Sequence, residues 1–139
     1  MLVRSVISGF IIVGLMACGK PADEAPNEPT LRVDRNAVDF GREFGTAVWI
    51  GTTPQESLLV ENLGLQPLVI ESVDQAGDSA FKYELPEKRE IEPLGHTFVR
   101  VTFTPTEAKE YTGSLTIVSN AANEPQKTVQ LSGKGVKPE

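Results

Sequence analysis

The sequence has very few of the side chains that disulfides and transition-metal sites need. Its 139 residues include one cysteine, Cys18, one histidine, His96, and two methionines, Met1 and Met16. A single cysteine excludes an internal disulfide. Zinc, iron and copper sites are built mainly from Cys, His and Met side chains, so we expect no metal site and no cofactor in the folded part of the chain.

Positive charge is also scarce. There are 13 Lys and Arg residues against 19 Asp and Glu residues, which gives a formal net charge of −6. Removing residues 1–17, whose only charged side chain is Arg4, would make it −7. Proteins that bind nucleic acid usually carry a basic footprint, so we expect no nucleic acid among the partners.

The N-terminal apolar run is too short to cross a membrane as a helix. Residues 1–17 place Arg4 before the apolar stretch 6–17, and a spanning helix needs about 20 such residues. The stretch ends in Leu-Met-Ala-Cys-Gly at residues 15–19. This ending resembles the bacterial lipobox, and the resemblance implies a signal peptide, residues 1–17, that is cleaved before a diacylated Cys18. The alternative is an ordinary secretory signal followed by an incidental cysteine.

An acylated Cys18 would attach the chain to a lipid bilayer. Each buried CH₂ group of an acyl chain contributes about 0.8 kcal/mol, so two or three chains hold a protein lastingly. Gly19 is not the aspartate that is linked to inner-membrane retention, so we expect the outer membrane, at its periplasmic or surface face. Residues 19–29 contain three prolines, three acidic residues and no large apolar side chain. We expect residues 18–29 to form the lipidated cysteine and a flexible linker.

Residues 30–136 show short runs in which apolar and polar side chains alternate, the period of a β-strand. Gly, Pro and Asn residues separate the runs, and no run has a sustained helical period. Aromatic residues make up only 6% of the chain, so the core must consist mostly of Val, Leu and Ile. The pattern predicts an all-β fold, a single immunoglobulin-like (Ig-like) sandwich of about seven strands. The expected strands are 31–33 and 38–40 (a broken first strand), 57–62, 68–73, 81–85, 98–103, 115–118 and 128–131, with a loop at 74–79.

An ordered set of short motifs extends over the same region. They are Val38-Asp39-Phe40-Gly41, Asn62-x-Gly64-x-x-Pro67, Ile91-x-Pro93, Val101-x-Phe103-x-Pro105, Tyr111-x-Gly113-x-Leu115 and Val129-x-Leu131-x-Gly133-x-Gly135. In this order they resemble the ASH (abnormal spindle/hydin) family of Ig-like domains, which is common in bacterial "choice-of-anchor D" proteins. That family is similar in fold to major sperm protein and the PapD chaperone. The resemblance implies a domain that binds proteins and does not catalyse a reaction.

One interval departs from the family pattern. The segment between Gly41 and Leu58 is longer than the usual link, and it contains the only tryptophan, Trp49. Trp49 is either a core residue in an altered edge strand or an exposed binding feature.

The alternation also predicts which apolar side chains point away from the core. If Leu58, Val60 and their counterparts in the other strands point inward, the residues between them point outward. A contiguous outward apolar patch would indicate an interface, and strand addition at a sheet edge is a second recognition route. The candidate binding surface for an unknown envelope protein consists of Trp49, Leu59, Val69, Phe98 and Val118.

Three other classes of function are the alternatives: a hydrolytic envelope protein, an ion-binding accessory protein and a purely structural spacer without a binding partner. Ser79 would need a histidine base and a strand-to-helix elbow, but no helix is predicted and the only candidate base is His96. The acidic residues of two expected loops lack the ligand spacing of a calcium loop; they are Asp74, Asp78, Glu87, Glu90 and Glu92. We therefore expect no enzyme, no catalytic residue and no small-molecule substrate, but a lipoprotein with a binding or scaffolding domain.

Overall fold

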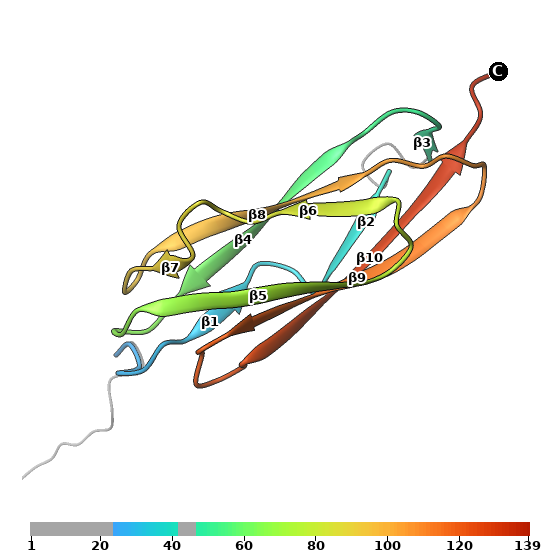
Figure 1. Cartoon of the computed structure of the whole chain (residues 1–139). Coiled ribbons are helices and arrows are strands. Elements are labelled where there is room, and N and C mark those ends of the chain that lie inside the picture. The colour runs from blue at the N-terminus through green and yellow to red at the C-terminus, as the bar shows by residue number, and fades with distance from the viewer. Residues whose placement is uncertain (1–23, 42–46) are drawn as a thin grey trace, which may run out of the picture.

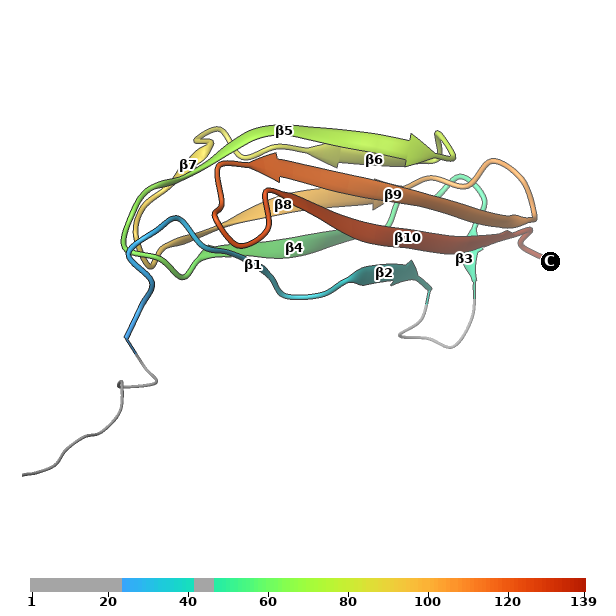
Figure 2. The same cartoon turned by 90° about the horizontal axis from the view of Figure 1, so that it is seen from below.

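The computed structural model describes residues 24–41 and 47–139, and these residues form two β-sheets packed face to face (Figure 1). One sheet has the strand order β1-β4-β8-β6 and the other the order β2-β10-β9-β5-β7, with β3 also pairing with β10. Figure 2 looks onto the sheet that contains β5, β9 and β10, with β4, β8 and β6 of the other sheet behind it. The strands are β1 (Leu31–Val33), β2 (Ala37–Phe40), β3 (Val48–Trp49), β4 (Gln55–Asn62), β5 (Leu68–Gly77), β6 (Phe81–Glu84), β7 (Glu90–Ile91), β8 (His96–Phe103), β9 (Glu110–Ser119) and β10 (Gln126–Val136).

The all-β sandwich expected from the sequence is confirmed, with ten strands where about seven were predicted. The additional strands, β3 and β7, have two residues each. The broken first strand is present as β1 and β2, which belong to different sheets. Strand β1 pairs antiparallel with β4, whereas β2 pairs parallel with β10. In the part of the chain that the structure describes, no helix is long and apolar enough to cross a membrane.

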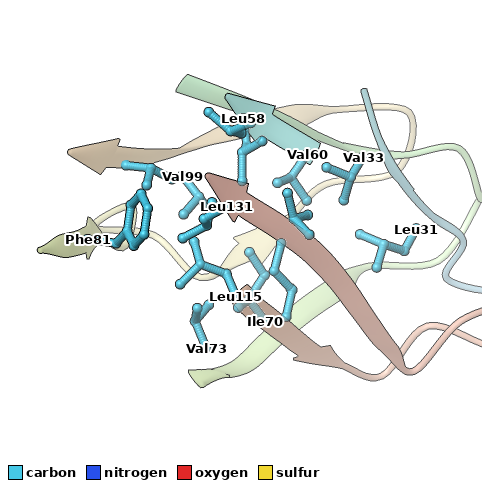
Figure 3. Packing of buried hydrophobic residues seen from close by; sticks show 14 of the residues in the cluster. Leu31, Val33, Leu58, Val60, Ile70, Val73, Phe81, Val99, Leu115 and Leu131 are labelled. Atoms are coloured by element: carbon cyan, nitrogen blue, oxygen red, sulfur yellow. The ribbon is translucent and has the colours of Figure 1, made fainter. Parts of the chain in front are cut away.

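The core consists of the alternate side chains that the sequence predicted to point inward (Figure 3). Their burial is the main stabilising term, because each fully buried Val, Leu or Ile contributes about 1.5–3 kcal/mol. Three phenylalanine rings, Phe40, Phe81 and Phe103, pack together with centroids 4.9–6.0 Å apart. The side chains with no exposed surface include Leu58, Val60, Leu68, Val99, Val101, Leu115, Ile117 and Val129.

Tyr111 closes one end of this core at the start of β9. Its ring is 4% exposed and lies edge-on to Phe103, with centroids 5.4 Å apart. Its phenolic oxygen accepts hydrogen bonds from the backbone N–H groups of Thr106 and Glu107, at 3.2 and 2.9 Å. A tyrosine that begins this strand and bonds to backbone a few residues upstream is the tyrosine corner of Ig-like sandwiches.

Strand β5 is longer than the sequence indicated. We expected it to end at Val73 and a loop to follow, but the strand continues to Gly77, which pairs with Gly113 of β9. The last four residues of β5 are exposed, so no alternation of apolar and polar side chains identifies them as a strand. Backbone pairing with β9 holds them instead.

The domain begins within the segment that we expected to be a linker. The Pro26 carbonyl accepts a hydrogen bond from the Leu65 N–H, and the Pro29 carbonyl accepts one from the Ala122 N–H, both at 2.9 Å. Residues 26–29 therefore lie against the sandwich, and contacts with the domain start before residue 30. These contacts are made by backbone groups, which explains why the composition of residues 19–29 did not reveal them.

Asn62 holds this end of the sandwich together. Its side chain is fully buried, and its oxygen accepts hydrogen bonds from the N–H groups of Gly64 and Thr30, at 2.9 and 3.3 Å. Its amide nitrogen donates to the carbonyls of Gln66, Ile91 and Glu92, at 2.7–3.3 Å. Residues 26–30, 62–67 and 92–95 meet at this end of the sandwich, which we call the N-terminal pole. Both views place β3 and the C-terminal end of β10 at the opposite end, the far pole (Figures 1 and 2).

Candidate interaction surface

Phe98 is the most exposed aromatic side chain of the described residues after Trp49, which lies on the short strand β3. It lies on β8 with 52% of its surface exposed, whereas its neighbour Val99 is fully buried. The strand explains this difference, because successive side chains point to opposite faces of the sheet. The ring of His96, also on the outer face, stands edge-on to Phe98 with the centroids 5.7 Å apart.

Leu59 of β4 lies directly opposite Phe98 in the register of the two strands. Directly opposite side chains on one face of an antiparallel pair are in contact range, with Cβ atoms about 4.5–5.5 Å apart. Asp34 fixes Leu59 from the other side: its backbone N–H donates to the Leu59 carbonyl and its carboxylate accepts from the Leu59 N–H, both at 3.1 Å. Two of the predicted surface residues therefore form one apolar pair.

An open groove of about 560 Å³ lies beside this pair. Phe98 and Arg100 of β8 form one wall, and the segment after β6 forms the other wall with Leu85 and Pro86. We call the set Leu59, Phe98, Leu85 and Pro86 the Phe98 strip. Phe98 is its exposed centre, whereas Leu59, Leu85 and Pro86 are half-buried and Leu85 also packs against the core.

Charged residues flank the Phe98 strip on both sides. In one neighbouring row Arg32 pairs with Glu61, which lies opposite His96. In the other row Arg100 and Glu84 form an ion pair at 3.0 Å. Exposed ion pairs contribute little to stability, but a charged rim around an apolar centre is the usual composition of a protein–protein interface.

A second charged cluster follows strand β1, which forms one edge of this sheet. Arg35 binds the carboxylate of Asp34 at 2.9 Å and that of Glu56 at 3.5 Å. The hydrogen bond to Asp34 raises the pKa of Arg35 above its ordinary value, so this side chain stays positively charged beside the strip.

The other predicted surface residues lie elsewhere. Val69 of β5 and Val118 of β9 are half-buried on the second sheet, where Val69 is bonded to Asn120, two residues beyond Val118. Trp49 lies at the far pole with 61% of its surface exposed, and Val48 takes the buried position beside it. The structure therefore excludes a core position for Trp49, and its role as a binding feature stays a prediction. The five predicted residues thus form three separate places rather than one patch.

The residues considered for catalysis and ion binding do not come together. Ala80, next to Ser79, has its carbonyl bonded to the N–H of Thr104, just beyond the end of β8, whereas His96 begins that strand. Eight residues of strand separate the two positions by roughly 26 Å. Among the described residues, no group of three or more His, Cys, Asp and Glu side chains could hold a metal ion.

The predicted lipidation site, Cys18, lies outside the described residues. The sequence analysis also missed some exposed apolar side chains that the structure reveals. Leu65 and Leu94 are 43% and 64% exposed, and they lie in turns at the N-terminal pole. Alternation between strand faces says nothing about side chains in turns. Leu85 and Pro86 are half-buried: Leu85 ends the expected strand 81–85 on the same face as the buried Phe81, and Pro86 follows it.

Comparisons with known proteins agree with this architecture. The family model for the HYDIN/CFA65/VesB-like Ig-like domain matches residues 29–134. No curated protein sequence matches the chain. A protein of unknown function from Porphyromonas gingivalis W83 has a TM-score of 0.64 at 20% identity, and the match covers 82% of this chain and 50% of that chain. The chain therefore spans about half the length of that protein.

Two further structures are similar to this chain. PapD-like domain 7 of human CEP192, an ASH domain, has a TM-score of 0.63 at 20% identity, covering 91% of this chain and 99% of that domain. The VesB protease of Vibrio cholerae has a TM-score of 0.57 at 12% identity, covering 76% of this chain and 32% of the protease. The protease is matched only through its Ig-like domain, so these similarities show the fold and not an activity. The chain belongs to the HYDIN/CFA65/VesB-like family of Ig-like domains, as its resemblance to ASH domains implied.

Proposed function

We propose that this chain is a non-catalytic lipoprotein of the cell envelope whose Ig-like domain binds another protein through the Phe98 strip. The observation that carries the proposal is the exposed ring of Phe98, opposite Leu59 and beside an open groove. Exposed aromatic side chains inside a charged rim are typical centres of protein–protein binding. A PapD-like fold supports the same class of function.

We further propose that Cys18 carries the lipid and that the chain resides in the outer membrane. The support is the lipobox-like sequence before Cys18 and the glycine that follows it. Attachment to a bilayer raises the effective concentration of the domain near other envelope proteins, so a strip of this modest size can bind usefully. The role that follows is assembly or scaffolding within an envelope complex.

Photocrosslinking in the native cell tests the binding surface. A photoreactive phenylalanine analogue replaces Phe98 in the full chain, and a matched chain carries the same analogue at Gln130, which is exposed on the other sheet. We expect a discrete crosslinked product from position 98 only, at least several-fold weaker when Leu59→Ser is added. Equal products at both positions, or a product at 98 that Leu59→Ser leaves unchanged, would overturn the assignment.

Alkaline washing of membranes tests the anchor separately. We expect the wild-type chain to stay with the membrane and the Cys18→Ser chain to be released. Retention of the Cys18→Ser chain after washing would show that something other than an acyl group on this cysteine holds the protein.

A further inference from the structure

Two of the large exposed apolar side chains, Leu65 and Leu94, lie together at the N-terminal pole. Their turns are joined by a hydrogen bond from the Leu94 N–H to the Gly64 carbonyl at 3.2 Å. The Leu65 N–H binds the Pro26 carbonyl at 2.9 Å, so the same pole receives the chain from its N-terminal side. The turns that carry the two leucines therefore lie beside Pro26, where the domain begins.

The backbone of Leu94 is in an unfavourable conformation. Its φ is 61°, and among the described residues it is the one non-glycine residue with a positive φ. The Cβ atom makes this left-handed region costly, and leucine has no polar side chain that could compensate locally, as asparagine has. The turn is nevertheless fixed, because Gly95 donates to the Glu92 carbonyl and accepts from the Asn62 N–H, both at 2.9 Å.

This strain does not bury the side chain, because Leu94 is 64% exposed. A costly backbone conformation that presents an apolar side chain to the outside is better explained by contact with something outside the domain than by folding.

We propose that the N-terminal pole rests on the lipid bilayer, with Leu65 and Leu94 in the boundary between headgroups and acyl chains. The inference rests on the proposed acylation of Cys18. Seven residues lie between Cys18 and Pro26, so the Cα atoms of these two residues are at most about 29 Å apart in any conformation. The 11-residue strand β10 is roughly 36 Å long, so this pole is the part of the domain nearest the anchor, and the far pole is the most distant.

The charges at the pole specify the kind of lipid. The exposed side chains of Glu28 and Glu92 lie on the segments that form it, and Glu24 lies two residues before them; within the described part of the chain only Glu92 of the three has a basic partner, Lys88, at 3.4 Å. Carboxylates are repelled by anionic headgroups. The pole therefore fits zwitterionic lipid, and the contact is apolar rather than electrostatic.

This orientation has a consequence for the proposed binding surface. With the N-terminal pole on the bilayer, the Phe98 strip lies on the side of the sandwich and Trp49 points away from the membrane at the far pole. A partner of the strip would then approach parallel to the membrane surface.

Depth-dependent fluorescence quenching tests the proposal on the full, acylated chain. Because Cys18 is the only cysteine and acylation blocks its thiol, a cysteine added by Gln66→Cys is a unique labelling site at the pole. The matched chain carries Lys137→Cys near the far pole. Both are labelled with the same environment-sensitive dye, in phosphatidylethanolamine–phosphatidylcholine vesicles that contain acyl-chain nitroxide quenchers.

We expect the dye at position 66 to be quenched at least threefold more than the dye at position 137. Leu94→Asn, which suits the left-handed backbone, and Leu65→Gln should each reduce that difference at least twofold without unfolding the domain. Phe98→Asn, on the side of the sandwich, should leave it unchanged. Equal quenching at both positions, or no effect of the leucine variants, would overturn the bilayer contact.

Two further measurements distinguish loss of the lipid anchor, contact with anionic lipid and contact with a protein from the proposed bilayer contact. Flotation of the same vesicles tests whether the chain is anchored to lipid. If the chain floats but the dye at position 66 is not quenched, the bilayer contact of the pole is wrong and the lipoprotein proposal stands. If the chain does not float, both proposals are wrong. Replacing a third of the lipid by phosphatidylglycerol should weaken quenching, and stronger quenching would contradict a zwitterionic partner. Protection of position 66 in native membranes but not in pure vesicles would assign the pole to a protein and overturn the inference.

Discussion

The side-chain oxygen of Asn62 accepts a 2.9 Å hydrogen bond from the backbone N–H of Gly64, inside the fully buried end of strand β4. The same side chain also bonds to the segment before β1 and to the segment around β7. One buried amide thus connects three parts of the chain that form the N-terminal pole, and the first two predictions concern this connection.

Asn62→Ala should lower the free energy of unfolding by about 2–4 kcal/mol, because it leaves several buried backbone groups without a partner. Urea denaturation measures this loss. The control is Asn27→Ala, whose exposed side chain accepts one hydrogen bond, from the Gln66 side chain, among the residues that the structure describes, and whose removal should cost less than about 0.5 kcal/mol. Equal losses for the two variants would contradict the role given to Asn62.

Gly64→Ala should detach the N-terminal segment from the sandwich. A Cβ atom at residue 64 would lie 1.7 Å from the backbone oxygen of Glu28, so one of the two segments must move. We expect hydrogen exchange at the Leu65 amide, which binds Pro26, to accelerate at least tenfold. The control is Gly51→Ala, where a Cβ meets no atom within 4 Å and only the positive φ of 88° is strained; it should leave that amide protected. Unchanged protection in Gly64→Ala would show that residues 26–29 are not docked.

Tyr111→Phe should lower the melting temperature by a few degrees, because the N–H groups of Thr106 and Glu107 lose their acceptor while the ring still packs on Phe103. The hydrogen bonds from Thr106 and then from Glu107 also lower the pKa of Tyr111, whose oxygen lies at the border with solvent.

The sign of this pKa shift gives a pH dependence. A folded-state pKa below the unfolded value of about 10 means that ionisation favours the folded state. The contribution is complete above pH 10 and is lost as the pH falls through the folded-state pKa. The stability difference between wild type and Tyr111→Phe should therefore grow between pH 8 and pH 10.5. A constant or shrinking difference in thermal unfolding over this range would contradict the hydrogen-bonding account.

Substitutions of two adjacent residues should have different effects: Val99→Ser should lower the stability of the fold, and Phe98→Ser should abolish binding of the partner. Val99 is fully buried, so its replacement by serine should cost about 2–4 kcal/mol. Phe98 is half exposed, so Phe98→Ser should change the free energy of unfolding by less than about 1 kcal/mol and still abolish capture of the partner. A large loss of stability in Phe98→Ser would assign the ring to packing instead of binding.

The strands at the centre of this fold are predictable from the sequence, because each has one buried face and one face that points outward. Leu58 and Val60, or Val99 and Val101, alternate with polar or outward residues, and all four are fully buried. Where neither face is buried the prediction fails, as at the end of β5. The docking of residues 26–29 could not be predicted, because backbone carbonyls make these contacts and leave no pattern in the side chains.

The candidate surface was predictable only in part, for a related reason. The outward direction of Leu59, Phe98 and Val118 follows from alternation, but which of them are neighbours depends on the pairing of strands. The register of β4 and β8 places Leu59 opposite Phe98, while Val118 lies on the other sheet. The exposed position of Leu94 could not be predicted, because it depends on a positive φ that glycine or asparagine normally adopts and that a leucine in the sequence does not indicate.

Both the proposed function and the bilayer contact depend on a lipid at Cys18, so the intact mass of the mature chain, purified from the native membrane, is the most direct measurement. We expect a polypeptide that begins at Cys18 and is heavier than its sequence by a diacylglyceryl group, with or without a third acyl chain on its amino group. A mature chain with an unmodified Cys18, or one that retains residues 1–17, would contradict the account.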